Sequence, residues 1–190
     1  MNKLIFEQKT RSVWDFIANN QCAEAEQALS VLVDGMSYKD LRTFAHIQYK
    51  KQEMLYNAGC FAAAWCLQDG EILNDGYYMF HTFLAGMMPM EQLDTYIKNP
   101  DLLINYWPAL YASENNIGRI ALETMEEKFG FTSQDRWAFY DNYKSSMEDI
   151  TYQGKCGWQV LQYAETLVPK LWARYLTADP QMLEYRRAAF

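Results

Sequence analysis

The two histidines, His46 and His81, are the side chains best suited by type to acid–base or metal chemistry, and they lie 35 residues apart. Neither has a Cys, His or carboxylate three or four residues away, the spacing that brings two metal ligands onto one helix face. His46 is therefore expected on a helix surface or at the edge of the core, without a catalytic role. His81 follows Tyr77 and Asp75 closely, so it is the better candidate for a functional histidine.

An acidic loop precedes His81. Its carboxylates could in principle bind a divalent cation, but their spacing does not match a calcium loop, and turn and cap roles explain them better. Two tyrosines follow at once, and rigid aromatic side chains beside steering charges are typical of protein-binding surfaces. The predicted partner-binding residues are Asp69, Glu71, Asp75, Tyr77, Tyr78 and His81.

Signatures of nucleophilic or nucleotide chemistry are missing from the sequence. It contains no G-x-S-x-G, P-loop or G-x-G-x-x-G pattern, and its four cysteines form no CxxC pair. We therefore predict no catalytic residue, no cofactor, no metal and no enzymatic activity. Gly154 to Gly157 has a GxxG spacing without basic flanks and is interpreted as a flexible turn. The cysteines, Cys22, Cys60, Cys66 and Cys156, are expected to be reduced thiols in the core.

Charge is distributed unevenly along the chain. The net charge is −7, and residues 61–127 carry ten acidic against two basic side chains, whereas the segments on either side are nearly balanced. Such a field disfavours nucleic acid and membrane surfaces as partners and favours a basic protein. The alternative is that the acidic residues only keep the domain soluble.

A cytoplasmic location is expected. Residues 1–7 have too few consecutive apolar side chains for a secretory leader, and the longest uncharged runs are shorter than the roughly 18 apolar residues that span a bilayer. Half of the residues are hydrophobic, which argues against disorder. A length of 190 residues suits one domain with one core.

Helical periodicity dominates the first third of the sequence. We expect a short helix around Trp14 and a second from Cys22 to Val33, ended by Asp34 and Gly35. Ser37 resembles an N-cap with an acidic residue three positions later, and the apolar rhythm then continues to Trp65. This predicts one long helix of about seven turns, in which Gly59 is a close-packing point or a bend.

Capping signals divide the rest of the sequence into several further predicted helices. Further helices are expected after Asn74 or Asp75, from Pro89 to before Asn99-Pro100, from Ser113 to Gly130, and from Thr132 onward. The apolar stripe from Val160 to Tyr175 contains Pro169, which predicts a kink or two short helices. The expected fold is an all-α, single-domain irregular bundle of about seven to eight helices, residues 1–190.

Several segments, in order, resemble the bacterial domain-of-unknown-function 4240 family, over roughly residues 12–130. They are Val13-Trp14, Asn74 to Leu84, Asn99-Pro100-Asp101-Leu102-Leu103, and Glu123 to Gly130. Asn74 replaces the first of the family's paired acids, and His81 stands where an Arg is usual. If the paired acids and the Arg form an ion pair or a ligand site in the family, the substitutions weaken that site here. The resemblance implies a helical fold and no particular activity.

Three functional hypotheses follow. The first is a protein-binding module, specifically an immunity protein that neutralises a cognate bacterial toxin by covering its active site with the acidic, aromatic surface. The second is a small-molecule-binding or enzymatic domain with a pocket around His81 and Asp75. The third is a scaffold without a discrete site.

Overall fold

The structure is a computed structural model, and it describes residues 3–19, 21–68, 70, 84, 88–106, 117–140 and 146–178. The described residues are mostly helical, which confirms the all-α fold class, with more helical segments than the seven or eight expected. The only strands among them, β1 (Thr151–Tyr152) and β2 (Lys155–Cys156), have two residues each and form an antiparallel hairpin. None of the described helices has the length and apolar character to cross a bilayer.

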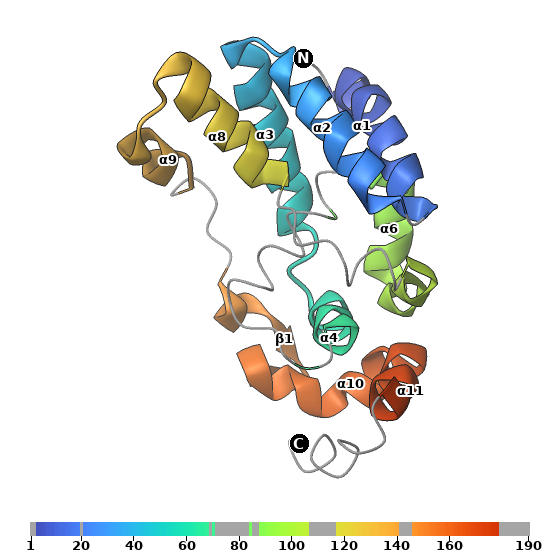
Figure 1. Ribbon diagram of the computed structural model, residues 1–190. Helices are drawn as coiled ribbons and strands as arrows, with labels where there is room; N and C mark the ends of the chain where they lie inside the picture. Colours follow the sequence, from blue (N-terminus) through green and yellow to red (C-terminus); the bar gives the residue numbers. More distant parts are fainter. Residues whose placement is uncertain are drawn as a thin grey trace.

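Four helices lie side by side at one end of the molecule (Figure 1). They are α1 (Lys3–Ala18), α2 (Cys22–Asp34), α3 (Tyr38–Glu53) and α8 (Ile117–Phe129). α1 packs on α2 and α3 packs on α8, so that Trp14, Leu29, Phe44 and Leu122 are buried between them. α2 ends at Asp34 as predicted, whereas α1 begins at Lys3 and is longer than the short helix expected around Trp14.

The prediction of one long helix from Ser37 to Trp65 is wrong. Its start is confirmed, since the Ser37 hydroxyl oxygen accepts a hydrogen bond from the Asp40 N–H at 3.2 Å. However, α3 ends at Glu53, and a new helix, α4 (Ala58–Leu67), begins after Asn57, whose side-chain oxygen accepts from the Cys60 N–H at 2.9 Å. The apolar rhythm runs across the break because both helices bury residues in the same core.

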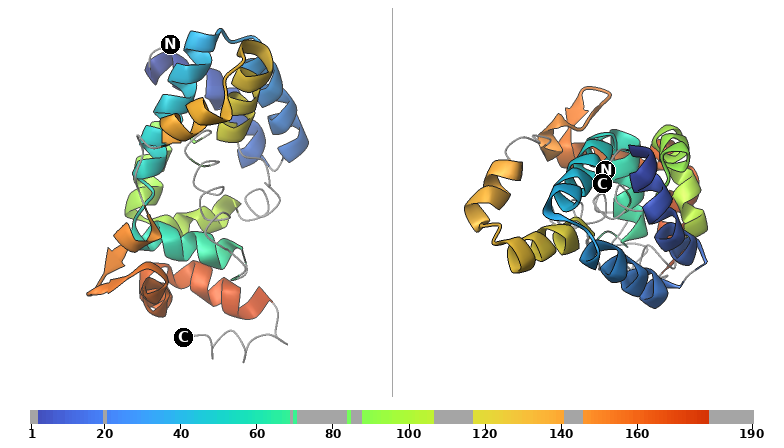
Figure 2. Two further views of the ribbon diagram at one scale, coloured as in Figure 1. Left: turned by 90° about the vertical axis from the view of Figure 1, so that its left-hand side faces the viewer. Right: turned by 90° about the horizontal axis from the view of Figure 1, so that it is seen from above.

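α4 is buried on nearly every side, and its residues Ala62, Ala63 and Ala64 have no exposed surface. Figure 2 shows it between the four-helix end and the C-terminal helices. Gly59 is a close-packing point, because a Cβ there would lie 2.9 Å from Pro100 Cγ. The segments that surround α4 are η1 (Pro100–Tyr106), η3 (Gly157–Tyr163), α10 (Ala164–Leu167) and α11 (Pro169–Ala178). Pro169 therefore starts a helix, and two short helices meet there, as predicted.

Asp101, in the segment that carries part of the family resemblance, caps α11. The residue is 5% exposed, and its carboxylate accepts hydrogen bonds from the Leu171 N–H at 2.8 Å and the Lys170 N–H at 3.0 Å. A carboxylate at this position satisfies two N–H groups that have no partner within the helix and faces the positive end of its dipole. The contact joins η1 to a helix almost 70 residues further along the chain.

α6 (Met90–Lys98) ends before Asn99-Pro100 as predicted, with Pro89 immediately before its first turn. It is attached to α1, because the Trp14 indole N–H donates to the Gln92 side-chain oxygen at 2.7 Å. The helices predicted after Asn74 or Asp75 and at Ser113 have starts that lie outside the described residues. The predicted end of α8 at Gly130 is confirmed, and this glycine has a φ of +66°.

The cysteine prediction is correct for two residues and wrong for one. Cys60 and Cys66 are buried, and burial raises the pKa of the Cys60 thiol to about 12, which keeps it protonated. Cys156 is exposed, because it lies in the hairpin and not on an apolar helix face. The turn between the strands has Gln153 and Gly154 at positive φ, the geometry of a tight hairpin. The Cys22 side chain lies outside the described residues.

Candidate functional site

The partner-binding surface predicted from the sequence cannot be placed. All six of its residues, Asp69, Glu71, Asp75, Tyr77, Tyr78 and His81, lie outside the described residues. That surface, and the alternative pocket around His81 and Asp75, stay predictions. The described part of the chain presents a different candidate, of opposite charge.

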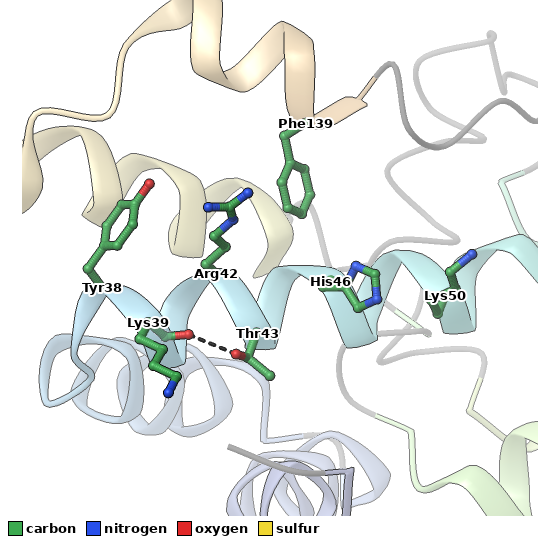
Figure 3. A pocket seen from close by; sticks show the side chains of 7 residues that line it. All are labelled: Tyr38, Lys39, Arg42, Thr43, His46, Lys50 and Phe139. Atoms are coloured by element: carbon green, nitrogen blue, oxygen red, sulfur yellow. Dashed lines mark hydrogen bonds between the residues drawn. The ribbon is translucent and has the colours of Figure 1, made fainter.

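The exposed face of α3 forms one side of an open groove of about 580 Å³. Lys39, Arg42, His46 and Lys50 follow one another at intervals of three and four residues, which places them on one helix face. All four are exposed, whereas Leu41, Phe44 and Gln48 on the other side of α3 are buried. The residues that line the groove, drawn in Figure 3, are Tyr38, Lys39, Arg42, Thr43, His46, Lys50 and Phe139.

The second side of the groove comes from α9 (Ser133–Tyr140), a helix that stands beside α8 at the margin of the molecule (Figure 1). In Figure 3 the Arg42 side chain points from α3 toward Phe139. The Phe139 ring packs edge-on against Tyr49 of α3, with ring centroids 5.3 Å apart. Arg136 on the same helix forms an ion pair with Glu126 of α8 at 2.7 Å. These two contacts hold α9 over α3.

One end of the groove is aromatic. The Tyr38 ring contacts Phe129 edge-on at a centroid distance of 5.6 Å, and the centroid of the Phe131 ring lies 6.3 Å from that of Tyr38. Phe129 is 46% exposed, and Trp137 on α9 is 68% exposed. The exposed Phe129 ring beside Tyr38 gives this end of the groove an aromatic surface of the kind found in protein-interaction hot spots.

Two carboxylates close to this face, those of Asp135 and Asp40, form hydrogen bonds at helix starts. The Asp135 carboxylate accepts hydrogen bonds from the Thr132 hydroxyl at 2.7 Å and the Thr132 N–H at 2.9 Å. These bonds are the main cause of the lowered pKa of Asp135, and the positive charge of Arg42 contributes. Asp40 accepts from the Ser37 hydroxyl at 2.9 Å. Among the described residues that line the groove, the charged ones are Lys39, Arg42 and Lys50, and none carries a carboxylate.

Lys50 at the far end of the groove contacts an acidic neighbour. Its ammonium lies 3.1 Å from the Glu53 carboxylate, one helical turn away, in an ion pair that is largely exposed. Exposed pairs of this kind contribute about 0.5 kcal/mol and exchange readily with other partners. Lys50 places a positive charge at this end of the groove.

His46 is exposed on α3, which confirms the predicted helix-surface position. The basic row of Lys39, Arg42, His46 and Lys50 is hidden in the charge of the N-terminal segment, because acidic and basic residues balance over residues 1–60. The signal that would have found the groove was the spacing of three and four residues among these four side chains. The described residues contain no group of three or more His, Cys, Asp or Glu side chains placed to hold a metal ion.

No protein-family model, no curated protein and no solved structure matches this chain. The resemblance to the domain-of-unknown-function 4240 family therefore stays a prediction.

Proposed function

We propose that the chain is a protein-binding module that takes an acidic segment of its partner in the groove between α3 and α9. The observation that carries this proposal is the row Lys39, Arg42, His46 and Lys50 along one wall of a 580 Å³ groove that also has aromatic walls. Arg binds carboxylates in a bidentate manner, and Lys supplies a mobile positive charge. Charge complementarity of this kind speeds association and fixes the orientation of the partner.

An acidic protein segment fits better than a nucleic acid. The chain has a net charge of −7, so a long polyanion is repelled by the molecule as a whole while a short acidic segment meets only the groove. The aromatic side chains that line the groove, Tyr38 and Phe139, add the contact area that protein interfaces use.

Charge reversal in the groove tests the proposal. A fluorescein-labelled hexaglutamate peptide should bind the wild-type chain at low ionic strength, as measured by fluorescence anisotropy. In the double variant Arg42→Glu/Lys50→Glu, binding should weaken at least about tenfold, which corresponds to roughly 1.4 kcal/mol, because two attractive contacts become repulsive.

The matched control is Lys98→Glu/Lys155→Glu, which makes the same change of −4 in net charge at two exposed lysines, one in the last turn of α6 and one on strand β2, that do not line the groove. If the groove residues bind the peptide, this variant should bind it within about twofold of wild type, because the groove is intact and charges far from it are screened. Equal loss in the control and the double variant would attribute binding to net charge and contradict the groove.

The charge of residues 61–127 supports a second proposal, that the chain is an immunity protein that neutralises a basic toxin. Ten acidic against two basic side chains in this segment would steer a basic partner. The triple variant Asp69→Lys/Glu71→Lys/Asp75→Lys should then lose protection of growth when it is produced together with a toxin encoded beside its gene.

The groove variant Arg42→Glu/Lys50→Glu distinguishes the two proposals, because a basic toxin should not depend on it. Protection that survives the triple reversal would exclude the acidic surface as the toxin-binding site. Protection lost only in the groove variant would instead assign the partner contact to α3.

A further inference from the structure

A second, smaller pocket of about 180 Å³ adjoins the groove at its Lys50 end. The two share His46 and Lys50, which form the ridge between them. Whereas the groove is basic and aromatic, almost all of the surface of the small pocket is apolar. Its lining residues are His46, Ile47, Lys50, Lys51, Met54 and Met90.

Lys51 does not make this pocket polar. Its side chain is 3% exposed, and its ammonium donates a hydrogen bond to the Met88 carbonyl oxygen at 2.6 Å. The charge is thus directed to the backbone just before α6, and the methylene stem is the part that contributes to an apolar lining. The same bond fixes Met90 relative to α3, because residues 88 and 90 are joined by one short stretch of chain.

Resting on the function proposed above, we propose that this pocket receives an aromatic side chain of the acidic segment bound in the groove. Cavities of about 150 Å³ accept a benzene-sized guest, and this pocket measures about 180 Å³. Met54 and Met90 provide two thioethers, which contact aromatic rings favourably and adapt to their shape. Lys50, on the ridge, adds a cation close to the ring.

The distance between Arg42 in the groove and Lys50 beside the small pocket determines how far apart the acidic and aromatic residues of the ligand should lie. Arg42 and Lys50 are eight residues apart on α3, which is about 12 Å along a helix axis. An extended chain covers about 3.3 Å per residue, so its aromatic residue should lie about four positions from the acidic residue that pairs with Arg42. The recognised segment is therefore an acidic pair, a short polar spacer and a Phe or Tyr.

Two labelled peptides test this assignment: Glu-Glu-Ser-Gly-Ser-Phe and Glu-Glu-Ser-Gly-Ser-Ala. The Phe peptide should bind the wild-type chain at least about fivefold more tightly than the Ala peptide, because it adds a buried ring to the same charges. In Met54→Ala, whose side chain is already 38% exposed in the wild type, this preference should fall below about twofold while binding of the Ala peptide is unchanged.

Met147→Ala, which removes a half-buried methionine that lines neither the groove nor the small pocket, is the matched control and should keep the full preference for Phe. Equal binding of the two peptides to the wild-type chain, with both lost in Arg42→Glu/Lys50→Glu, would overturn the aromatic pocket and leave the proposed function standing. Binding of neither peptide at low ionic strength would overturn both.

Discussion

Replacement of Asp101 by Ala should lower the free energy of unfolding by about 3 kcal/mol, because a hydrogen bond to a charged group contributes about 1.5 to 3 kcal/mol. Asp101 is 5% exposed, and its carboxylate accepts hydrogen bonds from two backbone N–H groups, those of Lys170 and Leu171. Without it, both donors at the start of α11 lose their acceptor, and the Leu171 N–H is buried. The Asn variant should lose about half as much, because it keeps one acceptor oxygen and loses the charge.

Thermal unfolding followed by circular dichroism measures this effect. A loss of about 3 kcal/mol lowers the Tm of a chain of this size by roughly 6 to 12 °C. The control is Asp15→Ala, the same substitution at an exposed position of α1, which should change Tm by no more than about 2 °C. If the two alanine variants unfold at the same temperature, the carboxylate of Asp101 does not hold α11 in place.

Replacement of Gly70 by Ala should lower the free energy of unfolding by about 2 to 4 kcal/mol. Its φ of +79° is unfavourable for any residue with a Cβ, by about 1 to 2 kcal/mol. A Cβ would also lie 2.9 Å from Trp65 Cζ2 and 3.1 Å from the Tyr175 hydroxyl oxygen. These two rings pack on each other with centroids 4.6 Å apart, so neither can move aside cheaply.

A second glycine separates backbone strain from crowding. Gly154 has a φ of +75°, and a Cβ there would meet nothing within 4 Å. Gly154→Ala should therefore show only the backbone cost, about 1 kcal/mol, in urea unfolding. Adding Tyr175→Phe to Gly70→Ala should recover part of the loss by removing one of the two close atoms. If Gly70→Ala and Gly154→Ala lower the free energy of unfolding equally, the Trp65 and Tyr175 rings move to make room for the new Cβ.

Local signals predicted the fold well where the stabilising contact is itself local. Ser37, Gly130 and Thr132 mark helix ends through bonds to residues three to five positions away, and these ends could be found from the sequence. The break between α3 and α4 was missed because Asn57 caps α4 without interrupting the apolar rhythm on either side. The Asp101 cap could not be found, because its partners lie about 70 residues away.

In the candidate site, too, the features local in sequence could be predicted, whereas the contacts between distant residues could not. Segment charges drew attention to residues 61–127, whereas the groove depends on which face of α3 its basic residues share and on Phe139 from a distant helix. The helical spacing of Lys39, Arg42, His46 and Lys50 was present in the sequence. Nothing in it showed that α9 would return to form the opposite wall.

The position of α4 has a consequence for synthesis of the chain on the ribosome. This helix is apolar around its whole circumference, and much of its cover comes from α10 and α11, about 100 residues later. At elongation rates of about 5 to 20 residues per second, α4 leaves the ribosome roughly 5 to 20 s before these helices are made. A chaperone that shields apolar segments has this interval in which to bind, and truncation before residue 164 leaves α4 exposed to aggregation.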